Sequence, residues 1–326
     1  MRVLYYLCRK ITIIFAQKMD LQTALYRIGS YLKHYLTARH TGGHGIHSPY
    51  LFDWVRLVMH DKHSYYTWEK IENRRQIMLT DERTVEYVDY GSGGTPSTSP
   101  LERSAKSGDK TQAIGISRVK SGDRRKVREI AKGSLAKQKY AQMLARMVNW
   151  LGRPLLTSPS REGIGQEVSE DRKGLTIVEL GTSLGITTAY LAAMDSRNNV
   201  VTYEGCPGVV AVAKENWKVL GLKNIDCHVG EIDVAVLERD IEKVDLAFVD
   251  ANHTYASTRE YFNVLARKVH AKSVIVVDDI HYNRDMALAW RAICADERVT
   301  STIDLYQMGL VFFDKNYWKK HYKIRL

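Results

Sequence analysis

The second half of the chain shows short apolar runs that alternate with stretches of helical periodicity. The runs are residues 175–180, 199–203, 225–229, 244–249 and 273–277. The helical stretches between and after them lie near 187–195, 207–220, 233–241, 255–268 and 284–295. Alternation of this kind predicts parallel strands with crossover helices. Two final runs, 301–306 and 310–313, have no helix between them and predict an antiparallel hairpin at the sheet edge.

The first half of the chain reads as mainly helical. Leucine and isoleucine recur at helical spacing early in residues 19–88, and Ser48-Pro49 has the residues of a helix start. Residues 91–123 predict a long mobile loop, and residues 124–151 predict one helix, basic early and apolar late.

The predicted fold is therefore α/β: a Rossmann-like, doubly wound, mostly parallel sheet of seven strands with an antiparallel last strand. A mainly helical N-terminal region precedes it. The expected division is a helical lid region at 1–151, a polar linker at 152–173 and a ligand-binding domain at 174–326.

Composition excludes several protein classes. The 326 residues are 44% hydrophobic and 26% charged, which excludes wholesale disorder, a collagen-like fibre and a coiled-coil rod. The four cysteines form no CxxC pair, which excludes a disulfide scaffold and a zinc ribbon and favours a reducing, cytoplasmic compartment.

The charge is uneven along the chain. Residues 1–173 carry a net charge of +13 and residues 174–326 a net charge of −2. A basic front half is typical of contact with nucleic acid, an anionic membrane surface or an acidic substrate, and equally of a solvated basic face. No apolar run approaches the roughly 20 residues that cross a bilayer. The start of the chain is a poor signal peptide, its segment 4–15 can touch a membrane surface, and Met19 is an alternative start.

One motif predicts a cofactor loop. Residues 177–185 read as a strand, a glycine turn and a helix start. Gly181 lets the backbone turn tightly, Gly185 permits close packing, and Glu179 at the strand end can reach polar groups of a bound cofactor. A plain structural turn is the alternative interpretation of the same residues.

The next two strands supply further pieces of a nucleoside site. Glu204 follows Glu179 by 25 positions, at the end of the next strand, where a carboxylate can accept both hydroxyls of a ribose. A solvated charge is the alternative. Gly230 and Glu231 end the third strand, where an adenine would lie. These strand ends meet at the edge where open parallel sheets bind ligands.

The loop chemistry favours one nucleoside over another. An NAD loop has the pattern GxGxxG, with a second glycine that admits the pyrophosphate. Ser183 stands at that position, and the loop holds no Lys or Arg for a phosphate. The loop therefore suits S-adenosylmethionine better, and an NAD-binding oxidoreductase is kept as a rival.

Residues 175–326 resemble a class I S-adenosylmethionine-dependent methyltransferase, especially the small O-methyltransferases of the catechol and caffeoyl-coenzyme A type and their bacterial relatives. The resemblance is carried by VELGTSLGITTAYLA, VVTYEG, VDLAFVDANHTY, VIVVDDIHYN and MGLVFF. The front-half segment HGIHSP also resembles bacterial relatives. The function implied is methyl transfer from S-adenosylmethionine to an oxygen of a small molecule.

The resemblance also implies roles for acids and histidines. Asp250, Asp278 and Asp279 correspond to ligands of Mg²⁺ or another divalent cation, although Asp279 stands where the family usually has Asn. His253 stands where the catechol-type enzymes place a lysine base, which makes it the candidate general base, with Asp250 beside it in the catalytic and cofactor sites. His281 is a candidate for the lining of the same pocket.

Three further features are weaker candidates. The stretch 87–94 imitates a nucleotide loop, but no helix follows it. His40, His44 and His47 fit a structural loop, a lid or, least well, a metal site. The basic start of the 124–151 helix leaves an RNA methyltransferase or an RNA-binding module as the other rival. The expected partners are a small-molecule substrate and, as one assembly state, a second copy of the chain.

Overall fold

The computed structural model describes residues 21–39, 41–88, 123–152, 174–316 and 318–326. The expected loop at 91–123, the linker at 152–173 and the N-terminal 18 residues therefore fall wholly or almost wholly outside the described residues, as does His40.

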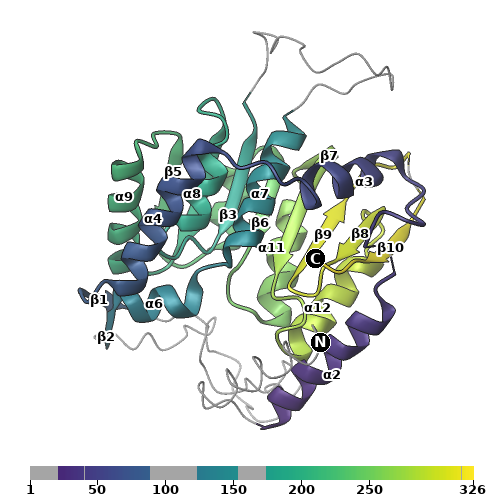
Figure 1. Ribbon diagram of the computed structural model, residues 1–326, viewed down its shortest axis with the longest axis horizontal. Helices are drawn as coiled ribbons and strands as arrows, with labels where there is room; N and C mark the ends of the chain where they lie inside the picture. The colour runs from purple at the N-terminus through teal and green to yellow at the C-terminus, as the bar shows by residue number, and fades with distance from the viewer. Residues whose placement is uncertain (1–20, 40, 89–122, 153–173, 317) are drawn as a thin grey trace, which may run out of the picture.

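An eight-stranded sheet forms the centre of the molecule (Figure 1). Its order is β10-β8-β9-β7-β6-β3-β4-β5. The strands are β3 (Thr176–Leu180), β4 (Asn199–Glu204), β5 (Ile225–Val229), β6 (Val244–Val249), β7 (Val269–Asp278), β8 (Ser301–Asp304), β9 (Met308–Phe312) and β10 (Lys320–Lys323). All neighbours pair in parallel except β9, which is antiparallel to both β7 and β8. The α/β prediction and the antiparallel late strand are confirmed.

The edge of the sheet differs from the sequence prediction. The β8–β9 hairpin is not the edge, because β9 lies between β7 and β8, and an eighth strand, β10, pairs outside β8. β10 has the sequence KHYK, in which Tyr322 is the one buried residue. A short strand with so little apolar character gives no periodicity signal, which explains why it was missed.

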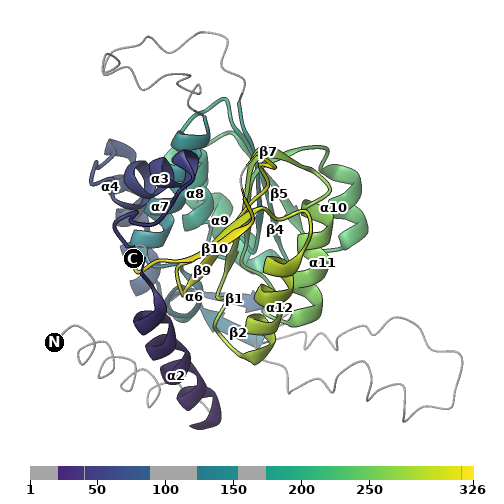
Figure 2. The same cartoon turned by 90° about the vertical axis from the view of Figure 1, so that its right-hand side faces the viewer.

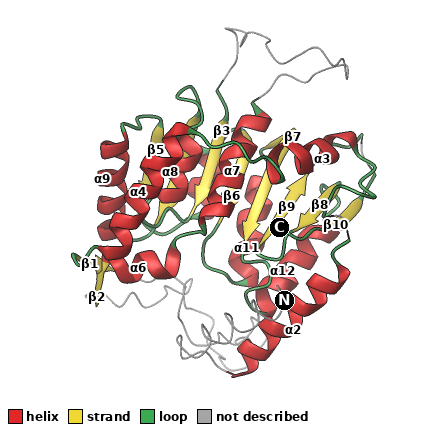
Figure 3. Cartoon of the chain, viewed as in Figure 1, coloured by secondary structure: helices red, strands yellow, loops and turns green. Residues whose placement is uncertain are grey.

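Helices cover both faces of the sheet (Figures 1 and 3). α10 (Val234–Asp240), α11 (Tyr255–Leu265) and α12 (Arg284–Ala295) pack on one face, where Phe262 and Trp290 meet side chains such as Val249 and Val277. α8 (Ile186–Ala192) packs on the other face beside the N-terminal helices, and α9 (Pro207–Leu220) packs against α8. This is the doubly wound arrangement that the alternating pattern predicts.

The N-terminal region contributes helices and one unexpected hairpin. It contains α2 (Leu21–Thr37), α3 (Pro49–Trp54), the π-helical turn η1 (Val55–Met59), α4 (Tyr66–Thr80), β1 (Thr84–Tyr87), β2 (Asp123–Lys126), α6 (Val127–Ser134) and α7 (Gln138–Leu151). Ser48 caps α3 by accepting from the Leu51 N–H at 3.3 Å, which confirms the predicted helix start. The single helix predicted for 124–151 is wrong: β2 pairs with β1 in an antiparallel two-stranded sheet, and the chain is extended at Leu135 between α6 and α7.

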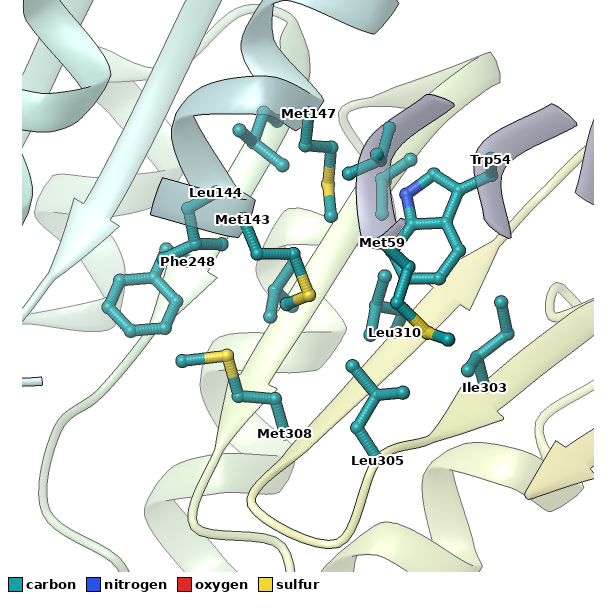
Figure 4. Close-up of a cluster of buried hydrophobic side chains, with 14 of the residues drawn as sticks. Trp54, Met59, Met143, Leu144, Met147, Phe248, Ile303, Leu305, Met308 and Leu310 are labelled. Carbon is teal, nitrogen blue, oxygen red and sulfur yellow. The ribbon is translucent and has the colours of Figure 1, made fainter. Parts of the chain in front are cut away.

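α7 belongs to the main hydrophobic core rather than to a separate body. Met143, Leu144 and Met147 on its inner face are fully buried, and they join one apolar cluster with Phe248 of β6 and Leu310 of β9 (Figure 4). A sheet face with apolar side chains must be covered, and α7 with η1 and α3 covers this one.

The strand order reverses beside β3, which places the ligand-binding edge. The chain runs outward from β3 to β4 and β5, and then returns to β6 on the other side of β3. The crossovers leave β3 and β6 in opposite directions, and open parallel sheets bind their ligands at the carboxyl ends of strands beside such a reversal. No helix among the described residues has the length and apolar character to cross a membrane.

The core position of α7 gives a stability prediction. Leu144→Ala should lower the free energy of unfolding by about 2–5 kcal/mol, because it removes a fully buried side chain and leaves a cavity. Urea unfolding followed by circular dichroism measures this. Leu36→Ala, which truncates a leucine that is 76% exposed on α2, is the control and should change stability by less than about 0.5 kcal/mol. Equal small effects would contradict the core assignment of α7.

Candidate active site

Two glycines shape the turn that follows β3. Gly181 has φ +98°, and a Cβ there would lie 2.0 Å from the carbonyl oxygen of Asp250 on the neighbouring strand end. Gly185 has φ +73°, and its Cβ would lie 2.5 Å from Nε1 of Trp217, which donates to the Gly185 carbonyl at 2.8 Å. Any side chain would break these approaches, so the predicted tight turn requires glycine at both positions.

Glu179 lies beneath this turn and is fully buried. Its Oε2 accepts hydrogen bonds from the hydroxyls of Thr188 at 2.5 Å and Thr202 at 2.7 Å. Its Oε1 accepts none from the described residues. Burial raises the pKa of Glu179 to about 8, and the charges of Asp250 and Glu204 add to the rise, although the threonine hydrogen bonds oppose it. The carboxyl is therefore mostly protonated at neutral pH.

Glu204 ends β4 and faces the same turn. Its Oε2 accepts from the Ser183 N–H at 2.8 Å and its Oε1 from the Cys206 N–H at 3.0 Å. Burial raises the pKa of Glu204, although these backbone N–H groups favour the charged form. Each oxygen keeps acceptor capacity for a ligand hydroxyl. The structure therefore brings together Glu179, Gly181, Ser183 and Glu204 as the sequence predicts.

The end of β5 lies next to Glu204. The Gly230 N–H donates to the Glu204 carbonyl at 2.9 Å, and Gly230 has φ +128° with open space where a Cβ would point. Glu231 follows as an exposed residue. Both residues stand at the predicted edge, in the position expected for the wall of an adenine site.

A histidine lies between two carboxylates at the ends of β6 and β7. Nε2 of His253 is 3.3 Å from Oδ1 of Asp250 and 3.5 Å from Oδ2 of Asp279. At these distances it makes no aligned hydrogen bond with a described residue. Burial disfavours the imidazolium, but Asp250 and Asp279 outweigh that effect and raise the pKa of His253 above its usual 6.5.

Hydrogen bonds from neighbouring elements hold His253 in a strained backbone conformation. Asn252 and His253 have φ values of +59° and +36°, in the left-handed region that non-glycine residues seldom adopt. The Asn252 amide donates to the Tyr261 hydroxyl at 2.7 Å, and the Asn283 amide donates to the His253 carbonyl at 3.3 Å. Contacts from α11 and from the loop after β7 thus hold the strained turn, as is common at functional sites.

Asp278 is the buried member of the acid group. Asp278 is only 6% exposed, and its Oδ1 has no hydrogen-bond partner among the described residues. Burial raises the pKa of Asp278 well above its usual range, and the charges of Asp250 and Asp279 act in the same direction. Asp279, at φ +53°, accepts a hydrogen bond from the side-chain amide of Gln307.

In this arrangement the three acids do not fit a divalent cation. The described residues contain no group of three or more histidine, cysteine, aspartate or glutamate side chains that could hold a metal ion. The imidazole of His253 lies between the carboxylates of Asp250 and Asp279, where a shared ion would have to lie. The expected metal set Asp250, Asp278 and Asp279 is thus brought to one edge but not into a coordination geometry.

The N-terminal region adds residues that sequence reasoning missed. Ser134 of α6 lies 2.5 Å from the Ser183 hydroxyl, oxygen to oxygen. The Arg27 guanidinium of α2 stacks over Tyr282 at 3.9 Å, and its Nε donates to the Tyr282 carbonyl at 2.9 Å. These contacts join segments far apart in the sequence, and no spacing rule could have indicated them.

The remaining candidates lie elsewhere. His281, expected in the pocket, has its Nε2 3.0 Å from Oδ2 of Asp304 and stacks on Tyr306. Tyr87 of the imitation nucleotide loop belongs to β1 and pairs with β2. His44 and His47 are exposed in the loop before α3.

Comparison with known proteins finds one protein family whose model matches part of this chain. Residues 178–280 match the model of a family described as a methyltransferase domain. No curated protein sequence matches the chain. The matched segment starts in β3 and ends after β7, so it contains the glycine turn, Glu204 and the acids described above.

Several solved structures are similar at low identity. A cofactor-bound protein from MTB is 19% identical, over 56% of this chain and 83% of its own, with a TM-score of 0.44. An O-methyltransferase from Bacillus cereus in complex with SAH is 17% identical, over 57% and 88%, with a TM-score of 0.43. An O-methyltransferase from Streptomyces achromogenes involved in tomaymycin synthesis, in complex with SAM, is 17% identical, over 55% and 82%, with a TM-score of 0.43.

At these identities and TM-scores the solved structures carry no assignment, which rests instead on the family model. The glycine turn between β3 and α8 and the acids at the strand ends lie within the segment that this model matches. Residues 178–280 of this chain are a methyltransferase domain.

Proposed function

We propose that this protein transfers a methyl group from S-adenosylmethionine to a hydroxyl oxygen of a small molecule. The observation that carries the proposal is the group of acids at the strand ends beside the glycine turn. Glu179, Glu204 and Asp250 end the neighbouring strands β3, β4 and β6, and their charges act on one another.

This electrostatic character distinguishes the cofactor. The pyrophosphate of NAD would face the carboxylates of Glu204 and Asp250 and would find no Lys or Arg in residues 181–185. S-adenosylmethionine instead carries a sulfonium and an ammonium, whose positive charges are attracted to the acids. It also carries ribose hydroxyls that can donate hydrogen bonds to Glu204. The open space where a Cβ of Gly230 would point leaves room for a nucleoside beside Glu204.

The acceptor chemistry follows from His253. S-adenosylmethionine, when bound, would supply an electrophilic methyl group on a sulfonium, and the leaving group would be a neutral thioether. His253 Nε2 takes the hydroxyl proton, and Asp250 and Asp279 stabilise the imidazolium that results. Asn283 and the strained turn hold the ring in place. No metal takes part in this account, because the acids do not fit one.

Three basic residues of the N-terminal region are engaged by acids, which makes them less available to a nucleic-acid acceptor. Lys126 and Arg128 both pair with Glu82, and Arg83 pairs with Asp81 and Glu215. Charges that are neutralised by neighbours leave less potential for a phosphate backbone. A small-molecule acceptor therefore remains the substrate class of this proposal.

Glu204→Gln tests the cofactor site. The substitution keeps the size of the side chain but removes the charge that accepts the ribose hydroxyls. The affinity for S-adenosylhomocysteine, measured by calorimetry, should fall by about 1.5–3 kcal/mol, the scale of charge-assisted hydrogen bonds. Unchanged affinity would remove Glu204 from the site. Glu238→Gln, on the exposed surface of α10, is the matched control.

His253→Ala tests the base. With an acceptor found by screening hydroxylated compounds, the rate of methyl transfer should fall about 10²–10⁴-fold, the usual range for a general base. Affinity for S-adenosylhomocysteine should stay the same. His63→Ala, at a loop histidine whose side chain is 89% exposed, should leave the rate unaltered. Full activity of His253→Ala would show that another group takes the proton.

Removal of divalent metal ions tests whether the acids act without a bound cation. Because His253 and Gln307 already engage Asp250 and Asp279, both turnover and S-adenosylhomocysteine affinity should be the same in EDTA and in Mg²⁺. A loss of turnover in EDTA that Mg²⁺ restores would mean that His253 leaves the carboxylates and that a cation replaces it.

A further inference from the structure

The β1–β2 hairpin lies against the turn that follows Glu204. Its two strands pair from Thr84–Lys126 to Tyr87–Asp123, and Arg125 stacks over the Tyr87 ring at 4.0 Å. The hairpin is placed at the start of α9, and Figure 1 shows it beside α6 at the carboxyl edge of the sheet. It lies outside the segment that matches the methyltransferase family.

The hairpin approaches this turn closely. The Cys206 thiol donates to the Glu86 carbonyl at 3.3 Å and accepts from the Val88 N–H at 3.4 Å. A Cβ on Gly208 would lie 2.3 Å from the Glu86 carbonyl oxygen. Only glycine allows this contact, because the Glu86 carbonyl oxygen belongs to the main chain and cannot rotate away.

Apolar packing supports the contact. Val209 and Val212 on α9 are buried with Cys206, and Val85 and Val88 of the hairpin segment pack against the same cluster. The position of the hairpin on α9 therefore rests on burial as well as on the two thiol contacts.

The second arm of the same unit reaches the other side of Glu204. α6 follows β2 directly, and its last residue, Ser134, donates to the Ile130 carbonyl at 2.9 Å. The Ser183 hydroxyl therefore donates to Ser134, at 2.5 Å between the oxygens. Ser183 and Cys206, whose N–H groups donate to the Glu204 carboxylate, are thus each in contact with the β1–β2–α6 unit.

We infer that the β1–β2–α6 unit is a positioning element that holds the Glu204 carboxylate in the orientation that binds the cofactor ribose. The unit acts through two contacts, that of Glu86 with Gly208 and that of Ser134 with Ser183. The inference rests on the proposed S-adenosylmethionine site. It adds a role for a segment that precedes the methyltransferase domain in the sequence and that neither the family model nor the glycine motif includes.

The physical reason is that Glu204 carries a desolvation cost at this place. Burial raises its pKa, and the backbone N–H groups of Ser183 and Cys206 compensate by stabilising the charged form. If either N–H moves, the carboxylate loses a donor and can turn away from the ribose. Small displacements of a charge-assisted contact cost affinity because the geometry of the hydrogen bond is steep.

A double-mutant cycle tests the inference. Gly208→Ala pushes the hairpin from the turn, whereas alanine itself is a better helix former than glycine at this position in α9. Ser134→Ala removes the other arm at an exposed residue and should not affect folding. Each is made in the full chain with Glu204 and again with Glu204→Gln, and S-adenosylhomocysteine binding is measured by calorimetry.

We expect each variant to weaken S-adenosylhomocysteine binding about tenfold when Glu204 is present, and less than about twofold in the Glu204→Gln background. Gly29→Ala, a substitution on α2 with nothing within 4 Å of the new Cβ, is the matched control and should bind as the unaltered protein does. Ser134→Thr, which keeps a hydroxyl, should restore most of the affinity lost in Ser134→Ala.

Two outcomes would overturn the inference. One is an equal loss in both backgrounds, which would show a general structural effect that does not pass through Glu204. The other is unchanged binding of Gly208→Ala and Ser134→Ala. Failure of the proposed function is distinguishable from both, because then the unaltered protein would itself not bind S-adenosylhomocysteine. Thermal unfolding of each variant confirms that it is folded.

Discussion

The close approach of β3 and β6 at their carboxyl ends is the constraint on which the site depends. The Asp250 N–H donates to the Leu180 carbonyl at 2.8 Å, and the next residue, Gly181, turns away at φ +98° with no room for a Cβ. Because the chain leaves β3 and β6 toward opposite sides, the two strand ends diverge above this contact. The turn that carries Ser183 and the position of Asp250 both follow from this one backbone approach.

Five acids lie at the same edge, and their charges are compensated in different ways. Glu179 and Asp278 lie in apolar surroundings that favour the protonated form. Glu204 is bound by backbone N–H groups, and Asp250 and Asp279 share the imidazole of His253. In the proposed function a positively charged ligand would be favoured here, since a cation would lessen the repulsion among these carboxylates.

The N-terminal region completes this edge from both sides. α7 belongs to the core, and it covers the sheet face that the family-matched segment leaves open. α2 contacts the loop after β7 through Arg27, and α6 contacts the glycine turn through Ser134 (Figure 2 shows α2 and the hairpin from the side). The segment that matches the methyltransferase family thus supplies the candidate site residues, whereas residues before it contact the loops that carry several of them.

The sequence by itself determined the alternating strands and helices, the glycine turn and the acids at the strand ends. Parallel strands are buried on both faces, so their apolar runs stand out in the sequence, and Gly181 and Glu204 follow those runs at fixed positions. The helix at 284–295 and the strands at 225–229 and 244–249 have the bounds that periodicity predicts. These features depend on residues that are close together in the sequence, so local sequence patterns predict them.

The tertiary structure alone decided how the side chains meet. His253 reads as a candidate base in the sequence, but its place between Asp250 and Asp279 depends on a strained turn and on Asn283, which lies 30 residues away. The β1–β2 pairing joins segments about 40 residues apart, and the contact of Glu86 with Cys206 spans 120. Neither has a periodic signature, because such contacts are set by shape and by the directions of single side chains after the sheet has formed.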